Sequence, residues 1–500
     1  MNFSTKDKLT EKDIQKGLKF VIKDGLATQA MITLTSGVFL VAFALQMGAS
    51  NIIIGLLAAI PPLSQLIQIP AVYLIEKFRV RKAICVYTTG MSRFFWLFIA
   101  LTPFFFSSRL GLIILLIALF MNTILAAISN CSWNSWMRDL IPERQLGRFF
   151  SKRMGLSLLI GMILSLSAAL FIDLWKKHFD AIYGYSILFL LAFLAGMAGV
   201  YFISKIPEPR MMGRESGKFL SMLSQPFKDF NFKNLLIFSG SWNFAINLAA
   251  PFFTVYMLKM LQLDISLIIA LGILSQLTNL TFLRIWGKIS DNHSNKSVLS
   301  VSSPLFLLCI LAWTFTTMPE KHVLTLPLLI AIHFFMGISL AGVNLASRNI
   351  SLKLAPRQQA TPYLAAHSII NSLAAGIAPI IGGGLADYLV GRELNWKIIY
   401  KGPDGGFDFP ILSFQQWDFF FFFAFIIGLY SLHRLAMIKE EGDVEKRVVI
   451  NTFFSELKRP IRNFSTAYGI SYMNQFPSLI KNLRRRKRNL VSSLSLHHEK

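Results

Sequence analysis

Long apolar stretches recur along this chain from Leu26 almost to its end, and no other feature constrains the fold as strongly. A helix needs about 20 predominantly apolar residues to cross the roughly 30 Å hydrocarbon core of a bilayer. Strands of a transmembrane barrel would instead alternate polar and apolar residues over about ten positions, whereas these stretches are continuous. The sequence therefore predicts an all-α, polytopic membrane protein with twelve transmembrane helices. The predicted segments are residues 26–47, 51–75, 83–107, 111–137, 154–172, 183–204, 235–257, 265–286, 297–318, 325–347, 361–386 and 417–437.

The composition agrees with this fold class and excludes several functions. Only 15% of the 500 residues are charged and the mean hydropathy is +0.53, whereas about 25% of the residues of soluble domains are charged. The sequence contains no nucleotide-binding loop, catalytic triad pattern or clustered metal ligands, so we expect no enzyme activity, no cofactor and no metal site. Cys85, Cys131 and Cys309 lie in or near apolar segments, which predicts packing roles rather than disulfides.

The positive charges indicate how the chain is oriented. Lys and Arg accumulate in cytoplasmic loops, and most of the 50 Lys and Arg fall in loops that share a side with the N-terminus. This bias predicts a multi-pass protein of the cell (inner) membrane with both termini in the cytoplasm. The net charge of +24 follows from the same bias and favours contact with anionic membrane lipids rather than nucleic acid. The first 25 residues lack the order of a signal peptide, so we expect this end to be retained.

The chain also repeats itself. Leu140-Ile-Pro142 after the fourth segment matches Leu354-Ala-Pro356 after the tenth, 214 positions later, and the loop at Glu76 matches the loop at Asp291 at nearly the same offset. These matches predict two similar six-helix halves. Parallel repeats of this kind are one transporter architecture. The predicted units are an N-terminal half at 1–204, a cytoplasmic linker at 205–233, a C-terminal half at 234–437 and a basic cytoplasmic tail at 438–500.

Two segments outside the helices are expected to be irregular. The long outside loop 389–416 is rich in Gly and Pro, which predicts an irregular cover. The tail ends in the basic run Arg484 to Arg488. Either this tail lies on the anionic inner leaflet or it is disordered, and the sequence leaves both alternatives open.

Several motifs resemble those of one transporter family. Gly287-Lys-Ile-Ser-Asp291-Asn-His-Ser-Asn-Lys296 is similar to the G-x-x-x-D-(R/K)-x-G-(R/K)-(R/K) loop of the major facilitator superfamily, and a weaker copy surrounds Glu76. The stretches from Trp133 to Arg144 and from Trp242 to Phe253 resemble segments of a bacterial, largely uncharacterised branch. The resemblance implies two pseudo-symmetric six-helix bundles and a central cavity lined by segments 1, 4, 7 and 10.

Two pairs of asparagines are the first candidates for contact with a solute. Asn130 and Asn134 in the fourth segment, and Asn243 and Asn247 in the seventh, are four residues apart and so share a helix face. Burying an unpaired amide costs a few kcal/mol, so each pair needs a partner. Either they bind solute or they join neighbouring helices, at roughly 1 kcal/mol each; both alternatives are open.

Aromatic residues stand beside both pairs. Trp133 and Trp242 either stack on a ring of the solute or fill space. Trp136 lies nearer the following loop, and we expect it to be an anchor at the membrane interface.

Ionisable groups inside the segments bear on coupling to a proton. None of the predicted segments carries Asp or Glu near its midpoint, and His333 is the best single titratable candidate, with Asn344 three turns further along. A lone His among apolar residues is more often a packing residue, and His367 is a weaker candidate. For Arg93 we favour snorkelling or a structural ion pair over an anion-binding role. Coupling to a proton or cation is left open.

Charged residues at the cytoplasmic ends of the helices are candidates for a gate. An acid there can stabilise a helix N-terminus of the opposite half and so latch the two halves together. The alternative is ordinary solvated charge, worth under about 1 kcal/mol per pair. The predicted gating residues are Glu76, Arg81, Arg138, Asp139, Asp291 and Lys353.

These observations predict a secondary or facilitative transporter that moves a small solute by alternating access and acts as a monomer. Amides and aromatics at the candidate site favour a neutral, zwitterionic or amphiphilic solute. The alternative from another class is a transporter-like receptor or scaffold that signals through the basic tail. The predicted solute site consists of Asn130, Trp133, Asn134, Trp242, Asn243, Asn247, His333 and Asn344.

Overall fold

The computed structural model describes residues 5–6, 9–142, 145–210, 224–317, 321–356, 360–402 and 405–465. Within these ranges, 12 helices are long and apolar enough to cross a membrane. This confirms the all-α, polytopic fold class predicted from the sequence. Residues 211–223 of the predicted linker and the run Arg484 to Arg488 lie outside the described residues.

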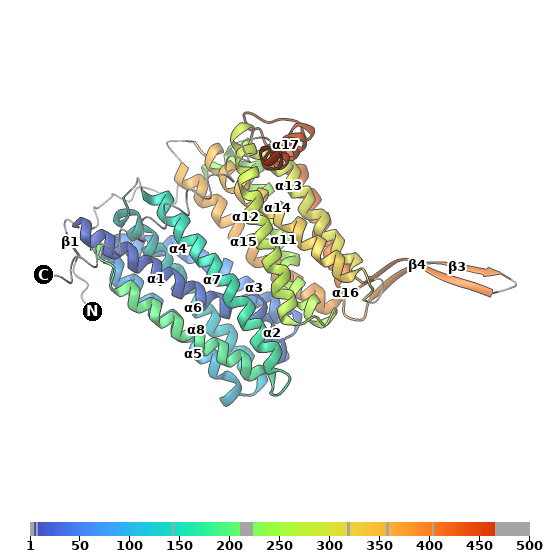
Figure 1. Ribbon diagram of the computed structural model, residues 1–500, viewed down its shortest axis with the longest axis horizontal. Coiled ribbons are helices and arrows are strands. Elements are labelled where there is room, and N and C mark those ends of the chain that lie inside the picture. Colours follow the sequence, from blue (N-terminus) through green and yellow to red (C-terminus); the bar gives the residue numbers. More distant parts are fainter. Residues whose placement is uncertain are drawn as a thin grey trace, which may run out of the picture.

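The first six spans form one group of helices, coloured blue to green in Figure 1. The first span is divided into two helices, the second contains a short 3-10 turn, and the other four are continuous. In chain order the elements are α1 (Glu11–Thr35), α2 (Val38–Gln46), α3 (Asn51–Ser64), the 3-10 turn Gln65–Ile67, α4 (Gln68–Phe78), α5 (Arg81–Phe105), α6 (Ser108–Leu140), α7 (Leu146–Trp175) and α8 (Ala181–Ser204).

The last six spans form the second group, coloured yellow-green to orange. The strands β1 (Thr5–Lys6) and β2 (Glu208–Pro209) pair in parallel and join the start of the chain to the segment after α8. The remaining helices are α10 (Gln225–Lys228), α11 (Phe230–Lys259), α12 (Ile265–Asn292), α13 (Asn295–Ala312) with the 3-10 turn Trp313–Phe315, α14 (Thr325–Leu354), α15 (Ala360–Tyr388), α16 (Gln416–Ala436) and α17 (Lys446–Ser465).

The first helix begins well before the predicted start at residue 26. Thr10 Oγ1 accepts the N–H of Asp13 at 3.2 Å and the Asp13 carboxylate accepts the N–H of Thr10 at 3.3 Å, a capping box that fixes the helix start. As a result, Asp24 lies inside the span. The helix breaks at Gly37, whose φ of 59° is a conformation that side chains with a Cβ rarely adopt, and α2 completes the crossing.

The prediction of an irregular cover at 389–416 is wrong. These residues contain the antiparallel strands β3 (Glu393–Gly402) and β4 (Gly405–Gln415), which project from the bundle at the right of Figure 1. Gly405, with φ 129°, supplies the backbone conformation that turns the chain. Across the strands, Tyr400 stacks on Phe407 with ring centroids 5.4 Å apart, a cross-strand pair of the kind that stabilises hairpins.

The two groups of helices touch mainly along two pairs of helices, α3 with α15 and α7 with α12, with smaller contacts of α2 and α3 with α11 and of α2 with α12. Small residues make the first contact close. A Cβ on Gly55 would collide with Pro379 O, and a Cβ on Gly383 would collide with Asn51 O. Such glycines let helix backbones approach each other directly.

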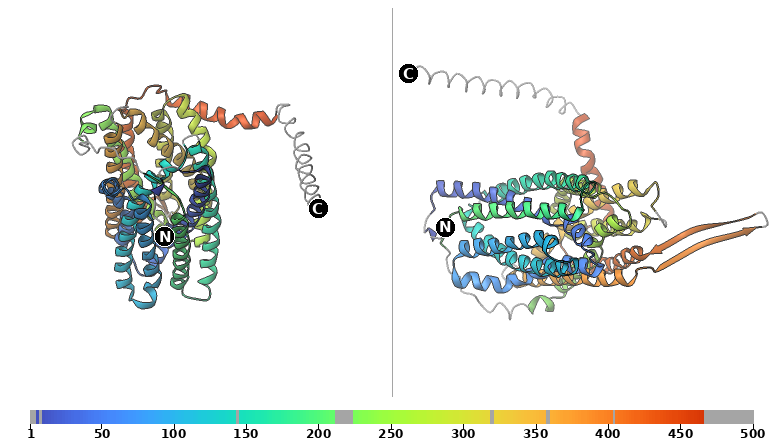
Figure 2. Two further views of the ribbon diagram at one scale, coloured as in Figure 1. Left: turned by 90° about the vertical axis from the view of Figure 1, so that its left-hand side faces the viewer. Right: turned by 90° about the horizontal axis from the view of Figure 1, so that it is seen from below.

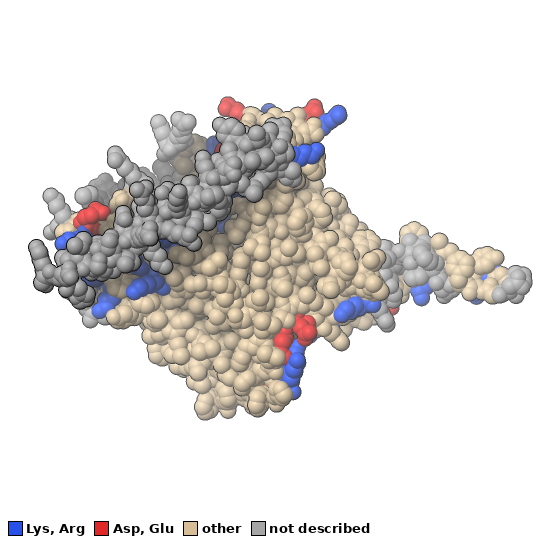
Figure 3. All heavy atoms as spheres, in the orientation of Figure 1, with Lys and Arg blue, Asp and Glu red and all other residues tan. Residues whose placement is uncertain are grey.

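The bundle has two different faces. Because the number of spans is even, the start of α1 and the helix α17 lie on one face, here called the basic face, and β3 and β4 lie on the opposite hairpin face. Figure 1 shows the basic ends of the two groups pointing apart, with α1 at the left and α17 at the top. Figure 2 shows the start of α1, in dark blue, and the hairpin at opposite ends of the helices. Between the faces, Figure 3 shows a broad uncharged surface with charged residues at its margins, as expected for helices in hydrocarbon.

Candidate functional site

An acidic residue ties the two halves together on the hairpin face. Asp387, near the end of α15, accepts hydrogen bonds from the first turn of α3 in the other half. The donors are Asn51 N at 3.0 Å, Asn51 Nδ2 at 2.8 Å and Ile52 N at 3.0 Å. The free N–H groups and the dipole of a helix N-terminus favour a carboxylate at this position.

A second tie is the pseudo-symmetric copy of the first. Asp173, near the end of α7, accepts hydrogen bonds at the start of α12 from Ile265 N at 3.3 Å and Ser266 N at 2.8 Å. Lys176 adds an ion pair with Asp264 at 2.6 Å. The two capping aspartates are 214 positions apart, and so are the helix starts that they cap, which is the offset of the internal repeat.

The arrangement of these ties shows which face of the bundle joins the halves. Among the described residues, every hydrogen bond between the halves lies on the hairpin face. The basic ends of the halves diverge instead (Figure 1). In the described residues, hydrogen bonds therefore join the halves at the hairpin face, and none joins them at the basic face.

Two of the gating residues predicted in the first half, Arg81 and Asp139, bond to each other. Arg81, fully buried at the start of α5, pairs with Asp139 on α6 and donates to Pro209 O at 2.8 Å. Glu208 Oε1 lies 3.7 Å from Arg81 Nε, at the start of α5. Burial raises the pKa of Glu208, although the nearby cations Arg81 and Lys82 oppose the rise.

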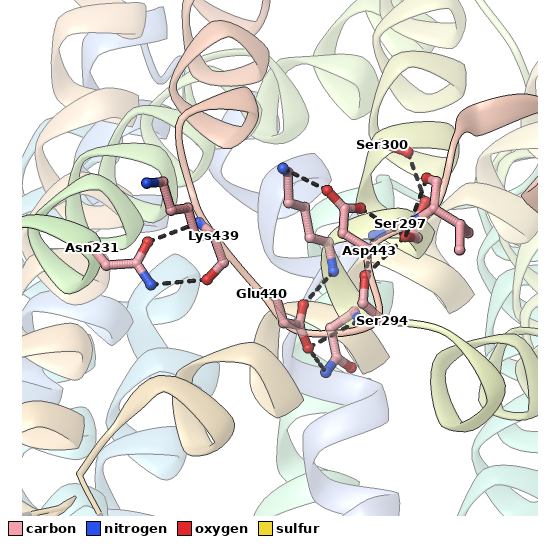
Figure 4. Close-up of polar contacts among 10 residues, drawn as sticks. Asn231, Ser294, Ser297, Ser300, Lys439, Glu440 and Asp443 are labelled. Atoms are coloured by element: carbon pink, nitrogen blue, oxygen red, sulfur yellow. Dashed lines mark hydrogen bonds and ion pairs between the residues drawn. The ribbon is translucent and has the colours of Figure 1, made fainter.

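The second half has a matching arrangement built from the C-terminal segment, shown in Figure 4. Glu440 accepts the N–H of Asn295 at 3.2 Å and of Lys296 at 2.7 Å, at the start of α13, and pairs with Lys353 at 3.0 Å. Asp443 pairs with Lys296 at 2.7 Å. The segment that follows each half thus places a glutamate on the N-terminus of that half's third span.

The other predicted gating residues have no such partners. Glu76, Arg138 and Asp291 form no ion pair with any residue that the structure describes. In this conformation none of the predicted gating residues bonds to the opposite half, because the basic ends are separated.

Unpaired amides line the fourth and tenth spans. Asn130 and Asn134 on α6 and Asn344 on α14 are exposed and make no side-chain hydrogen bond within the described ranges. Asn344 lies 214 positions after Asn130. Because unpaired amides are costly in hydrocarbon, these side chains fit a water-filled cavity. Trp133 is half-buried beside them, with its ring centroid 6.1 Å from that of Phe150.

The seventh and eleventh spans share a polar network. Asn243 Nδ2 donates to Ser239 O at 2.8 Å and to Asn371 Oδ1 at 3.2 Å, and Asn247 Nδ2 donates to Asn243 O at 2.8 Å. His367 Nε2 lies 2.9 Å from Ser239 Oγ and the His367 ring contacts Asn371. These residues are half-buried or buried, so the predicted amide pair of α11 is already partly satisfied by its neighbours.

Asp24 on α1 pairs with an arginine of α5. Its Oδ1 lies 3.7 Å from Arg93 Nη2 on α5 and accepts a hydrogen bond from Thr28 Oγ1 at 3.1 Å. Arg93 also donates to Thr28 Oγ1 at 2.7 Å and to Gly196 O. The expectation that no acid lies deep in a span is therefore wrong, and of the alternatives for Arg93 the structural ion pair is confirmed.

Three aromatic or titratable candidates lie in the packed core. Trp242 is 3% exposed and packs against Phe238 and Phe306. His333 donates from Nδ1 to Leu329 O of its own helix at 2.8 Å and packs on Trp313. The expected interfacial anchor Trp136 is instead fully buried and donates from Nε1 to Pro207 O at 3.0 Å.

The family of the chain follows from its whole sequence. The family model described as Major Facilitator Superfamily matches residues 25–379 and 235–473. The chain belongs to the major facilitator superfamily. As a major facilitator, it is a multi-pass secondary transporter of small solutes and not an enzyme.

Solved structures of several transporters share the fold. A mutant of the nucleoside transporter NupG superposes with a TM-score of 0.61 at 12% identity, over 85% of this chain and 100% of that chain. A POT family transporter in complex with a thioalcohol conjugated peptide gives 0.57 at 12%, over 85% and 96%. A bacterial metal transporter gives 0.56 at 12%, over 86% and 99%. At this identity the structures show the fold alone, and no curated protein matches the sequence.

Several residues that shape this major facilitator were not predicted as site residues. Asp173 and Asp387 lie at the ends of predicted segments. The sequence signal that could have identified them is their separation of 214 residues, which is the offset of the internal repeat. Asp24 lies before the predicted start of the first segment. Asn371 and Arg153 lie on spans that the resemblance did not assign to the cavity.

Proposed function

We propose that a small solute binds between the two halves and crosses the membrane by alternating access. One wall of the site is formed by the exposed amides of α6 and by Trp133. The other wall is formed by Asn344 and by the network of Asn243 and Asn247. The proposal is carried by one observation: among the described residues, every hydrogen bond between the halves lies on the hairpin face, which leaves these amides reachable from the basic face. Trp242 and His333, packed in the core, would act only by shaping the neighbouring helices.

The orientation and assembly state belong to the same proposal. The basic face is the cytoplasmic face of the cell (inner) membrane, and both termini lie in the cytoplasm, because Lys and Arg collect on that side. The units 1–204 and 234–437 move as two bodies joined by the linker 205–233, and the protein works as a monomer. The structure then represents the inward-open state.

The two faces would alternate as gates. In the inward-open state the capping aspartates Asp173 and Asp387 hold the hairpin face shut. In the opposite state the basic ends approach each other, and Asp291, Arg138 and Glu76, which have no ion-pair partner among the described residues, gain partners across the halves. Coupling to a proton would fall to Asp24, the buried carboxylate of the first span, rather than to His333.

Transport into proteoliposomes across a panel of small solutes tests the function. We expect the wild type to accumulate at least one solute and Asn247→Ala and Asn134→Ala to reduce its uptake, while Asn395→Ala in the exposed hairpin leaves uptake unchanged. If wild type and Asn247→Ala both bind a ligand and neither moves it, the receptor alternative is correct.

A further inference from the structure

An arginine inside the first half has no carboxylate of its own. Arg153 extends from α7 toward α1 and α6. Its Nε lies so close to Gly25 that a Cβ there would collide with it, and its guanidinium lies 4.9 Å from the centroid of the Trp133 ring. The Nε atom is buried and has no hydrogen-bond partner in the described part of the chain. Gly25 and Trp133 therefore enclose a guanidinium whose Nε has no acceptor among the described residues.

The charges around this guanidinium do not balance. Asp24 is within electrostatic reach of both Arg153 and Arg93, but its ion pair and its close contacts are with Arg93 and Thr28. Together these two arginines and one aspartate carry one net positive charge. Arg153 is half-buried, with its Nε enclosed, and charged side chains inside a membrane protein commonly mark the path of a substrate.

A second arginine, Arg348, lies on the tenth span, in the other half. Arg348 on α14 is exposed, one helical turn after Asn344, and makes no side-chain hydrogen bond or ion pair with the described residues. It lies 214 positions after Asn134, so the second half carries a cation where the first half carries an amide. The repeat also aligns Arg153 with His367, which contacts Ser239 just as Arg153 contacts its equivalent Gly25.

We propose that the transported solute carries an oxyanion, a carboxylate or a phosphate, which binds to Arg153 with Arg348 on the facing wall. A planar guanidinium forms paired, charge-assisted hydrogen bonds with both kinds of group. The face of Trp133 holds the guanidinium in place, and the nearby amides bind the rest of the solute. This inference rests on the proposed site between the halves, and it narrows the expectation of a neutral, zwitterionic or amphiphilic solute to one that carries an oxyanion.

Ligand-induced thermal stabilisation of the purified full-length protein tests this proposal. The probes are matched pairs of an anion and a neutral analogue at constant ionic strength: benzoate with benzamide, and glycerol phosphate with glycerol. A ligand that binds only the folded state raises Tm. We expect at least one anion to raise Tm and its neutral partner to have no effect, and the responding pair tells carboxylate from phosphate.

Substitutions then locate the effect. Arg153→Gln should weaken binding of the stabilising anion by about tenfold or more, because hydrogen bonds to charged groups are the stronger ones, and Arg153→Lys should retain part of the affinity. Arg109→Gln, on an exposed arginine near the hairpin face, is the matched control and should not change the affinity. If Arg153→Gln does not fold, the affinity of Arg348→Gln for the stabilising anion tests the proposal instead.

The proposal is overturned if the neutral partners stabilise as well as the anions, if no anion raises Tm, or if Arg153→Gln and Arg348→Gln keep wild-type affinity. Asn247→Ala separates this failure from failure of the proposed site. If Asn247→Ala loses the ligand and Arg153→Gln keeps it, the site stands and the anion inference is wrong. If Arg153→Gln loses it and Asn247→Ala keeps it, the anion contact stands and the site does not span both halves.

Discussion

Single residues set the electrostatics of the first half. Asp24 and Arg93 are 3% and 3% exposed, so neither charge is solvated and each depends on the other. Breaking a buried pair by removing one partner leaves the other charge uncompensated, which is far more costly than removing both. Gly196 and Gly199 leave the space that the Arg93 side chain occupies.

We therefore predict that Asp24→Asn lowers the free energy of unfolding by about 3 kcal/mol, because the charge of Arg93 loses its counter-ion. Arg93→Met should destabilise by a similar amount, and the double substitution should cost less than the sum of the two. Denaturation in detergent measures all three. Glu11→Gln, on an exposed residue of the same helix, is the control, and strictly additive losses would contradict the pairing.

Individual elements show what the sequence could predict. Continuous apolar runs located all the spans, because hydrocarbon leaves few other ways to satisfy a backbone. The start of α1 was missed because Asp24 and its charged neighbours lower the hydropathy of this segment. The helix begins instead at the capping box of Thr10. The hairpin was missed because Gly and Pro in loop 389–416 read as irregularity, although Gly405 closes a turn between strands.

At the candidate site, the sequence predicted which polar residues are exposed better than it predicted which aromatic residues are buried. The amides of α6 and Asn344 are exposed as a solute site requires, since polar residues on apolar helices stand out. Trp242 and Trp136 turned out to be buried, because a sequence does not fix which side of a helix meets another helix. Contacts between distant segments, such as those of Asp387 with α3, have no local signal.

The tail helix α17 is an element whose docking can be tested directly. Its Phe453 ring lies 4.8 Å from the centroid of Trp286 and 5.7 Å from that of Phe282, on α12, while the adjacent Phe454 is 52% exposed. Phe453→Ala should weaken docking of α17 by about 2 kcal/mol, less than for a fully buried Phe. Trypsin cleavage within 446–458 should accelerate in that variant and not in Phe454→Ala. Equal rates in the two variants would show that Phe453 does not hold the helix.

At the scale of the whole molecule, the internal repeat determines how the halves meet. The same contact, an aspartate on a helix start of the other half, occurs twice through Asp173 and Asp387, whereas the basic face has none within the described ranges. Two equivalent ties on one face bias a rocking protein toward the state that closes this face. Each tie stabilises only the state in which the hairpin face is closed, since its hydrogen bonds are lost when that face opens.

We predict that removing both ties shifts the protein toward the state that is open at the hairpin face. A helix cap contributes about 1 kcal/mol, so Asp173→Ala or Asp387→Ala should each change the equilibrium about fivefold, and the double variant by the product of the two. Spin labels on Ser108→Cys and Met260→Cys, one on each half, with Cys131→Ser to limit background labelling, report the distance across this face. The double variant should enlarge the long-distance population. Asp180→Ala is the matched control, because Asp180 caps α8 within its own half through Ile182 N at 3.1 Å and should leave the distances unchanged. An unaltered distribution in the double variant would mean that the close packing of α3 on α15, rather than the two aspartates, keeps the hairpin face shut.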